Sequence, residues 1–325
     1  MPTKTSTTEA RGGIDLGGTK IQTVVVDGRS KVRGEARRPT PTSGGPENVA
    51  AQMAEALREA AEAAGVEPGA LVGVGVGSPG EVDGHAGTVS QAKNLPGWAE
   101  TFALADWLAK KLGTAVKVGN DVQVATEAEF HLGAGRPYTS LIGIFWGTGV
   151  GGGIVLDGKP WLGRGSAGEI GHTVVKEGGA RCPCGRRGCL EAYAGRAAME
   201  AKAREENQAG RKTDLFKLMK KHGRDRLTSG IWERALAKGD ELAAELFDRA
   251  VRMLGAGIAS AVNLLDVEAV IIGGGIGVRM GEPYAKRIED AMGPHLFSDA
   301  SPPAVRVASL GDLGGAVGAS LLVKT

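Results

Sequence analysis

The sequence predicts an α/β protein built from two similar domains. Apolar, strand-like segments alternate with helical segments along the chain, which is the pattern of α/β folds. A chain of 325 residues exceeds what one hydrophobic core usually serves, so two domains are expected. Residues 14–28, "IDLGGTKIQTVVVDG", also align without a gap on residues 144–158, "IFWGTGVGGGIVLDG". Each segment predicts a strand, a glycine turn, a second strand and a closing Asp-Gly turn, so a hairpin repeated in two similar domains is expected. The alternative is that two glycine-rich hairpins resemble each other by chance.

The expected elements follow one another in an order that fits this assignment. Residues 46–65 predict an Ala-rich amphipathic helix that ends at a glycine, and residues 71–80 and 115–121 predict buried strands. A mostly helical region spans residues 191–265, with a polar break at 220–226. The remaining expected elements are a helix at 122–135, a strand at 267–277 with a helix after it, and a final small-residue helix at 312–323.

Composition excludes several classes of protein. Hydrophobic residues make up 42% of the chain and the net charge is +2, so neither a nucleic-acid nor a membrane partner is indicated. No apolar run reaches the roughly 20 residues of a membrane span, and residues 1–11 lack an apolar signal core. Three cysteines and no export signal lead us to expect a cytoplasmic protein.

The two glycine turns are candidates for binding phosphate. Backbone N–H groups in a turn without bulky side chains can approach phosphate oxygens closely. The first turn offers Gly17, Gly18 and Thr19, Lys20 adds a positive charge, and Asp15 is placed to meet a magnesium ion or its waters. The alternative is that Asp15 and Lys20 are ordinary polar hairpin residues. The second hairpin and a third glycine run, at 273–277, together indicate a bound nucleotide.

Asn120 and Asp121 end an expected strand. Ligands of open α/β sheets bind at the carboxyl ends of strands, and phosphoryl transfer needs a base that accepts the proton of the attacking hydroxyl. Asp121 is a candidate for that base. The alternative is an ordinary helix N-cap, since Asn and Asp are both favoured there.

All three cysteines lie within eight positions, close behind a histidine. The spacing from His172 through Cys182 and Cys184 to Cys189 supplies one imidazole and three thiolates, which is the donor set of a closed structural zinc site. The alternative is three free thiols in a loop, which would be prone to oxidation.

Such a zinc site would fix two carboxylates near one point. Glu169 precedes His172 by three residues and Glu191 follows Cys189 by two. Carboxylates are strong acceptors for sugar hydroxyls, and the second nitrogen of His172 could also bond a hydroxyl. The pattern therefore indicates a polyol site, unless both glutamates are merely solvated.

Five motifs in this order carry a resemblance to a known family. The segments "DLGGTK", "GND", "GTGVGGG", "GEIGH" and "CPCGRRGCLE" resemble those of the ROK family of repressors, open reading frames and sugar kinases. The resemblance runs from about residue 13 to the last helix. The cysteine stretch with its upstream Glu-x-x-His is its most specific part, because glycine turns are shared with hexokinases and actin-like ATPases.

The resemblance implies two ribonuclease-H-like domains of the actin and hexokinase type with a cleft between them. We divide them as a smaller domain of residues 1–119 and 311–325 and a larger one of 120–310. It implies Asp121 as the catalytic base, and zinc on His172, Cys182, Cys184 and Cys189. The residues implied to hold a sugar are Gly80, Asn120, Asp121, Glu169, His172 and Glu191. Those implied to hold ATP with Mg²⁺ are Asp15, Gly17, Gly18, Thr19, Lys20, Thr148, Gly149, Gly151, Gly274 and Gly275.

The activity that the resemblance implies is ATP-dependent phosphorylation of the 6-hydroxyl of a hexose. Residues 94–98, "NLPGW", and "GEIGH" look most like bacterial glucokinases, which favours glucose. Alternatives within the family are kinases of N-acetylmannosamine, N-acetylglucosamine or fructose. Two further alternatives are a non-catalytic sugar sensor and an actin-like ATPase. An actin-like ATPase would not explain the cysteines. Family members are commonly dimers, so a homodimer or a dimer of dimers is expected.

Overall fold

The computed structural model describes residues 9–298 and 300–323. Part of the N-terminal segment discussed above, residues 1–8, lies outside them. The described chain forms two compact units. Unit 1 comprises residues 9–133, 163–165 and 310–323, and unit 2 comprises residues 134–162 and 166–309 apart from residue 299.

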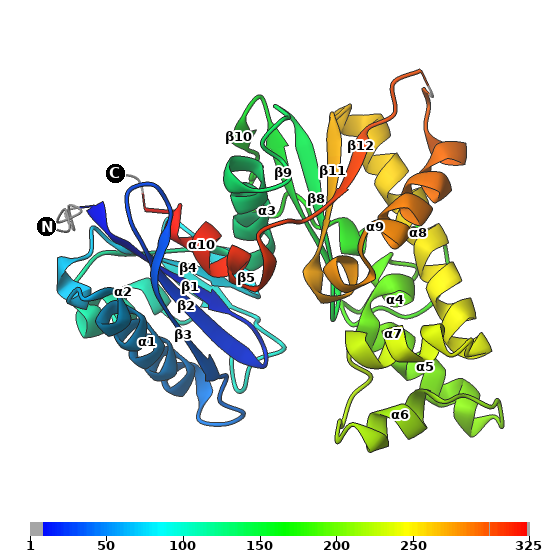
Figure 1. Cartoon of the computed structure of the whole chain (residues 1–325), viewed down its shortest axis with the longest axis horizontal. Helices are drawn as coiled ribbons and strands as arrows, with labels where there is room; N and C mark the ends of the chain where they lie inside the picture. Colours follow the sequence, from blue (N-terminus) through cyan, green and yellow to red (C-terminus); the bar gives the residue numbers. More distant parts are fainter. Residues whose placement is uncertain (1–8, 299, 324–325) are drawn as a thin grey trace, which may run out of the picture. The chain divides into compact units, whose positions relative to one another are not determined.

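Unit 1 is built on a five-stranded mixed sheet with the order β3-β2-β1-β4-β7 (Figure 1). Strands β1, β2 and β3 pair antiparallel, whereas β1, β4 and β7 pair parallel. The strands are β1 (Arg11–Leu16), β2 (Lys20–Val26), β3 (Val32–Pro39), β4 (Val74–Ser78) and β7 (Val116–Asn120). A separate hairpin consists of β5 (Glu81–Asp83) and β6 (Thr88–Ser90).

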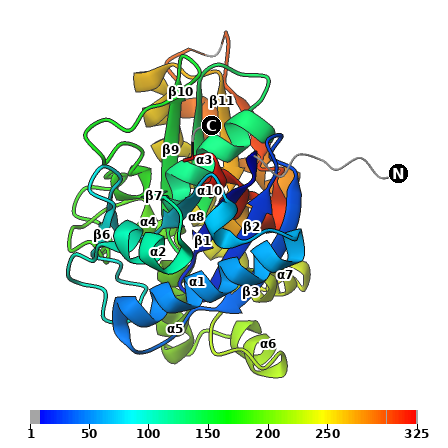
Figure 2. The same ribbon diagram turned by 90° about the vertical axis from the view of Figure 1, so that its left-hand side faces the viewer.

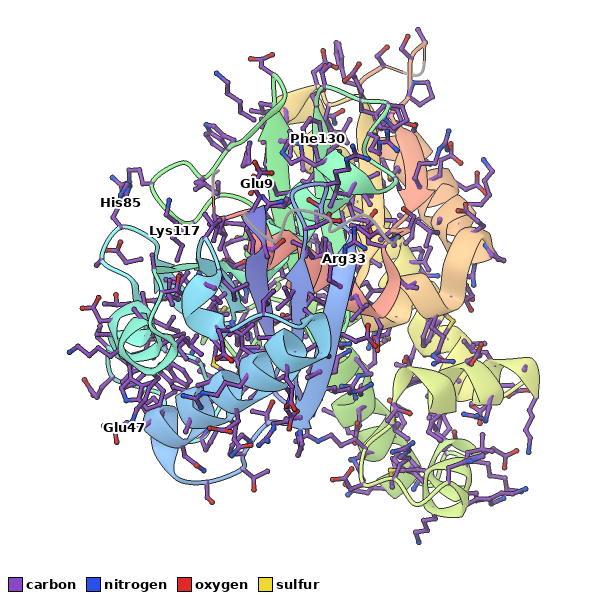
Figure 3. The ribbon with its side chains drawn as sticks, turned by 60° about the vertical axis from the view of Figure 1, so that its left-hand side comes forward. Glu9, Arg33, Glu47, His85, Lys117 and Phe130 are labelled. Atoms are coloured by element: carbon purple, nitrogen blue, oxygen red, sulfur yellow. The ribbon has the colours of Figure 1, made fainter. Side chains whose placement is uncertain are left out.

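Helices cover the sheet of unit 1. Helix α1 (Gly45–Ala64) packs on β2 and β3 and also against α2 (Leu104–Leu112), as Figures 1 and 2 show. Helices α3 (Asp121–Leu132) and α10 (Gly314–Ser320) pack on each other and on β4. Charged side chains such as Arg33, Glu47 and Lys117 lie exposed on the outside of the unit (Figure 3).

Glycines let α10 approach the sheet closely. A Cβ added at Gly13 would lie 1.9 Å from the carbonyl oxygen of Ala316, and one at Gly75 would lie 1.7 Å from that of Ala319. Both distances are far below van der Waals contact, so these two strand positions accept no side chain while α10 stays in place.

Unit 2 repeats the arrangement with the order β10-β9-β8-β11-β12. Here β8, β9 and β10 pair antiparallel, and β8, β11 and β12 pair parallel. The strands are β8 (Leu141–Trp146), β9 (Val150–Leu156), β10 (Lys159–Pro160), β11 (Ala269–Gly273) and β12 (Ala304–Val307). The two aligned segments of the sequence are β1 with β2 and β8 with β9, so the predicted repeat of a strand–glycine turn–strand hairpin is confirmed.

The helices of unit 2 come mostly from the region that the sequence marks as helical. They are α4 (Glu191–Ala194), α5 (Arg196–Gln208), α6 (Leu215–Lys221), α7 (Ser229–Ala237), α8 (Glu241–Leu265) and α9 (Gly274–Met292). The predicted polar break at 220–226 begins in the last two residues of α6 and continues in the loop before α7. Helix α8 supplies the largest apolar stripe, and its Phe247 packs between Trp146 of β8 and Trp232 of α7.

Short single turns of 3-10 helix connect several elements. They are η2 (Pro68–Ala70), η3 (Ile170–His172), η4 (Gly293–His295) and η5 (Gly311–Leu313). Among the described helices, none is both long and apolar enough to cross a bilayer. The first compact unit extends to Gly133 rather than to residue 119, because α3 packs against α10 and β4.

The close approach of α10 gives a prediction for stability. Gly75→Ala should lower the free energy of unfolding by about 1–3 kcal/mol, because its methyl group overlaps the backbone of Ala319. Gly69→Ala is the control, since its Cβ would meet nothing nearer than 3.6 Å. Chemical denaturation of both variants tests this, and equal stabilities would contradict the packing described here.

Candidate active site

The turn between β1 and β2 keeps its backbone accessible. The Gly17 N–H donates to the carbonyl of Lys20 (2.9 Å), which closes the turn. The Thr40 hydroxyl donates to the carbonyl of Gly17 (2.6 Å) and fixes it from the side. Gly18 and Thr19 are exposed at its tip. The turn is therefore held rigid while its outer face remains open to a ligand.

Asp15 and Lys20 flank this turn in an acidic surrounding. Burial raises the pKa of Asp15 to about 6, although nearby Lys20 opposes the shift. A Cβ added at Gly315 would lie 2.8 Å from the Asp15 carboxyl group, so a glycine makes room for it. The Lys20 ammonium group bonds Asp312 (2.9 Å) and Gln22 (2.8 Å). A phosphate group would therefore compete with Asp312 for Lys20.

Asn120 is the last residue of β7, and Asp121 is the first residue of α3. The Asn120 amide oxygen accepts the N–H groups of Val122 (3.1 Å) and Gln123 (3.2 Å), so Asn120 is the N-cap. Asp121 is the first residue of the helix, and its Oδ1 accepts the Val122 N–H (2.9 Å). The capping alternative thus holds for Asn120, while Asp121 is half-buried at the carboxyl end of a parallel strand.

Strand direction brings three predicted positions to one edge of the sheet of unit 1. Because β1, β4 and β7 run parallel, their carboxyl ends share an edge. The first glycine turn follows β1, Gly80 follows β4, and Asp121 follows β7. Gly80 has φ 93°, and its added Cβ would lie 2.5 Å from the Ser90 carbonyl, so this turn also requires glycine.

In unit 2, the carboxylate of Glu191 holds the turn between β8 and β9. Its Oε2 accepts the Val150 N–H (3.0 Å). A Cβ added at Gly149 would lie 2.1 Å from that same oxygen, so only glycine lets the carboxylate approach. Thr148 is exposed at the tip, and its carbonyl accepts the Ala197 N–H (3.0 Å) from α5.

The turn between β11 and α9 lies beside this second turn. Gly274 has φ 78°, and an added Cβ would lie 2.6 Å from the Trp146 carbonyl. A Cβ added at Gly147 would lie 3.8 Å from the backbone nitrogen of Gly275. Gly151 is different, since it lies inside β9 opposite Phe145 rather than in a turn.

His172, Cys182, Cys184 and Cys189 form a cluster that could hold a metal ion. Their donor atoms all lie within 4.8 Å of one another. The Sγ atoms of Cys184 and Cys189 are 3.7 Å apart, and Cys182 Sγ lies 3.7 Å from Nδ1 of His172. Zinc–sulfur bonds of about 2.3 Å at tetrahedral angles place ligand atoms about 3.8 Å apart, so the donor set and spacing fit zinc.

A tight loop builds this cluster. The Cys182 N–H donates to the Arg186 carbonyl (2.8 Å), and the Gly185 N–H donates to the Cys182 carbonyl (2.9 Å). Burial raises the pKa of the Cys182 thiol to about 12, whereas the Arg186 N–H lowers that of Cys184 to about 6. Burial also raises the pKa of the Cys189 thiol, so the loop presents one thiol that ionises readily and two whose ionisation a bound cation would favour.

Glu191 connects the cysteine cluster to the second glycine turn. Its Oε1 lies 3.9 Å from Cys182 Sγ, while Oε2 holds Val150. Glu169 lies next to the cluster along the chain, and its carbonyl accepts the His172 N–H (3.0 Å). The Glu169 side chain is exposed. Since Nδ1 of His172 faces Cys182, its Nε2 is the nitrogen that could meet a hydroxyl.

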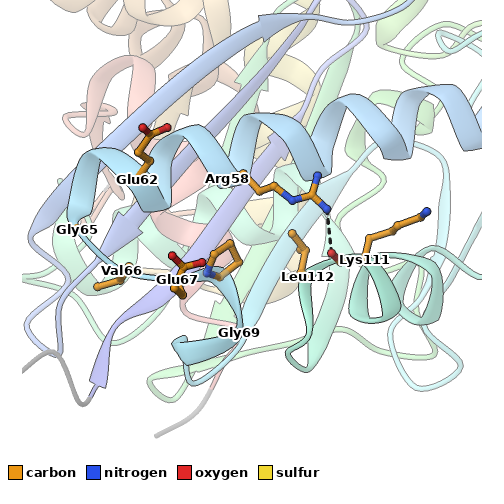
Figure 4. Close-up of a pocket in the computed structure, with 9 residues that line it drawn as sticks. Arg58, Glu62, Gly65, Val66, Glu67, Gly69, Lys111 and Leu112 are labelled. Atoms are coloured by element: carbon orange, nitrogen blue, oxygen red, sulfur yellow. Dashed lines mark hydrogen bonds between the residues drawn. The ribbon is translucent and has the colours of Figure 1, made fainter.

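A hollow on unit 1 is lined by none of these residues (Figure 4). It measures about 660 Å³ and lies among the end of α1, η2 and the end of α2. Gly69 and Lys111 line it, and so does Arg58, which donates to the Lys111 carbonyl (2.9 Å). Neither the glycine turn after β1 nor the junction of β7 and α3 contributes a residue to its lining.

Sequence reasoning missed several residues that shape the site. They are Asp312, which pairs with Lys20; Gly315, which makes room for Asp15; and Arg196, whose Nη2 donates to the Thr148 hydroxyl (2.8 Å). Only Asp312 and Gly315 had a visible signal, because "DLGG" at 312–315 repeats "DLGG" at 15–18.

Comparison with known proteins gives matches along nearly the whole chain. A glucokinase of Thermotoga maritima is 34% identical over 325 residues, covering 96% of each chain. An N-acetylmannosamine kinase of Haemophilus influenzae is 33% identical, covering 96% of this chain and 94% of that one. An N-acetylgalactosamine kinase of a Shewanella species is 32% identical, with 95% of each covered.

Solved structures share the fold. A ROK family glucokinase from Streptomyces griseus, in complex with glucose and AMPPNP, superimposes with a TM-score of 0.81 at 33% identity, covering 96% of this chain and 98% of that one. A ROK family transcriptional regulator, a homolog of the Escherichia coli MLC protein, gives 0.82 at 25% identity, covering 98% and 78%. The predicted actin and hexokinase type of α/β fold is thereby confirmed. Since the family model also matches residues 11–325, this chain belongs to the ROK family.

Proposed function

We propose that this protein is an ATP-dependent hexose kinase that transfers the γ-phosphoryl group of ATP to the 6-hydroxyl of glucose. The observation that carries the proposal is the shared edge of the sheet of unit 1. There the glycine turn after β1 and Asp121 after β7 lie at carboxyl ends of parallel strands. Kinase chemistry needs these two parts, a phosphate cradle and a base for the attacking hydroxyl.

Asp121 acts as the base in this account. Its carboxylate accepts the proton from the sugar 6-hydroxyl as that oxygen attacks the γ-phosphorus, and the bond to the β-phosphate oxygen breaks. The amide oxygen of Asn120 already accepts N–H groups of the helix cap, so its own amide N–H groups are the part that can meet the sugar. Gly80 contributes backbone, and Glu169 and Glu191 of unit 2 contribute acceptors for the other hydroxyls. His172 contributes the N–H of its Nε2, since its Nδ1 faces the cysteines.

The glycine turns bind the donor. The phosphate oxygens would be bound by Gly17, Gly18, Thr19 and Lys20 of unit 1, and Asp15 would meet Mg²⁺ or its waters. At the second turn, Thr148 and Gly149 of unit 2 also bind phosphate oxygens. Gly274 and Gly275 would lie against the adenosine of ATP. Gly151 supports the turn from inside β9. Mg²⁺, when bound with ATP, would neutralise charge on the phosphates.

Glucose is the proposed sugar because two of the relatives compared above are glucokinases, one of them solved with glucose and AMPPNP. Acetamido sugars are the second candidate, since similar relatives are kinases of N-acetylmannosamine and N-acetylgalactosamine. We also propose that the protein acts in the cytoplasm, in glycolytic glucose use, as a homodimer or a dimer of dimers.

A screen of acceptors tests the sugar. The wild-type protein with ATP and Mg²⁺ should phosphorylate glucose with the highest kcat/KM among glucose, mannose, fructose, N-acetylglucosamine and N-acetylmannosamine. A higher value for an acetamido sugar would contradict glucose and leave the kinase assignment intact. Lack of turnover with every sugar would instead favour a sugar sensor.

Replacement of the base gives a second prediction. Asp121→Asn should lower kcat by about 100- to 10,000-fold while glucose binding and folding stay near wild type, because the base acts in the transition state. Asp106→Asn is the control, since Asp106 also lies in the first turn of a helix of unit 1 but is exposed on α2. An Asp121→Asn variant within about tenfold of the wild-type rate would refute the role.

We propose that His172, Cys182, Cys184 and Cys189 bind one structural Zn²⁺. A metal with four protein ligands would fix the loop and, through Glu191, the second glycine turn. The spacing of the donor atoms supports this proposal.

Elemental analysis tests the zinc. The wild-type chain should carry about one zinc ion, and Cys184→Ser should weaken both zinc retention and glucose affinity because Glu191 and His172 lose their anchor. Arg187→Gln is the control, because that side chain lies in the same loop and supplies no ligand. If the metal is lost while glucose affinity is unchanged, zinc has no part in forming the sugar site.

A further inference from the structure

Three arginines line a small pocket beside the second glycine turn, within unit 2. The pocket measures about 270 Å³. Its lining residues come from the turn, from α5 and from the loop between α6 and α7; they are Thr148, Arg196, Ala197, Glu200, Ala201, Arg204 and Arg226. None of the roles proposed above uses these arginines.

The positive charges of the pocket exceed the negative charge that faces them. Glu200 is the one acidic residue of the lining, and its Oε1 accepts from Arg204 (2.6 Å) while its Oε2 accepts the Leu227 N–H (2.9 Å). Within residues 9–298 and 300–323, the side chain of Arg226 makes no hydrogen bond and no ion pair. Its exposed guanidinium group is therefore available to an anion.

Arg196 connects this pocket directly to the turn. Its Nη1 donates to the Leu227 carbonyl (3.1 Å) and its Nη2 to the Thr148 hydroxyl (2.8 Å), both of them neutral acceptors. A guanidinium group has five N–H donors, so others remain for a ligand. Burial lowers the pKa of Arg196, Glu200 opposes this shift and Arg226 adds to it. The group is thus a partly buried cation without a bonded carboxylate.

We propose that Arg196, Arg226 and the Thr148 hydroxyl form a phosphate subsite that binds a phosphate group of the phosphoryl donor. The inference rests on the proposed kinase function and extends it to recognition of the donor. A planar guanidinium fork matches two phosphate oxygens at once, which a single ammonium group does not. The position beside the turn fits a chain of linked phosphates, and this chemistry is shared by a nucleoside triphosphate and by inorganic polyphosphate.

Binding of tripolyphosphate tests the subsite without any need for turnover. Calorimetry on the complete wild-type chain at low salt should detect binding. Arg196→Lys should weaken it by about tenfold, because the fork is lost while the charge stays. Arg226→Gln should weaken it by about threefold, as expected for an exposed charge. Arg224→Gln, an exposed arginine of the same loop that does not line the pocket, should bind like the wild type.

Several outcomes would overturn the subsite. The first is that the wild type does not bind tripolyphosphate, and the second is that both pocket variants bind it as the wild type does. The third is that Arg224→Gln and Arg226→Gln weaken binding equally, because binding would then depend only on the net charge of the protein. Arg226 is exposed, so its variant reports on the subsite even if the Arg196 variant folds poorly.

Kinetics with two donors distinguish the sources of the phosphate. With glucose as acceptor, the pocket variants should raise the KM for the donor and leave the KM for glucose unchanged. If only the KM for ATP rises, the nucleotide is the occupant of the subsite. If only the KM for inorganic polyphosphate rises, that polymer is the occupant. An unchanged KM for both contradicts the subsite. If the wild type phosphorylates no sugar, the proposed function fails, whereas the calorimetry still decides the subsite.

Discussion

Parallel pairing of β1, β4 and β7 is the constraint on which the candidate site of unit 1 depends. Parallel strands end at one edge, so the turn after β1, Gly80 after β4 and Asp121 after β7 are brought together by the sheet itself. Unit 2 has the same arrangement: β8 and β11 pair parallel, and the turns that follow them lie side by side. In both units the loops can carry ligand-binding groups because the strands beneath them are rigid and buried.

Glu191 gives unit 2 a connection that the sheet alone does not provide. One carboxylate oxygen holds the backbone of the second turn, and the other lies beside Cys182. The cysteine loop and the second glycine turn are thereby connected by one side chain. A metal in the cluster would act on the turn through this carboxylate, which gives a physical reason for a structural ion in a kinase of this kind.

The sequence predicted the parts of the fold that have a local pattern. The hairpin repeat, the helix that ends at Gly65 and the Cys-rich loop each follow from spacing, glycine placement or ligand chemistry. Strand β3 was missed because half of its eight residues, VRGEARRP, are charged and it pairs only at the edge of the sheet. The contacts of Asp312 with Lys20 join residues almost 300 positions apart, and no local pattern encodes such a contact.

In the proposed reaction, Asp121 is the base for the hydroxyl that attacks the donor. A crystal structure with glucose and a non-hydrolysable ATP analogue tests it most directly. The glucose 6-oxygen should lie within hydrogen-bond reach of the Asp121 carboxylate, about 2.6–3.2 Å, and the triphosphate should lie along the glycine turns. A sugar bound with its 6-oxygen remote from Asp121, while another group approaches that oxygen, would contradict it.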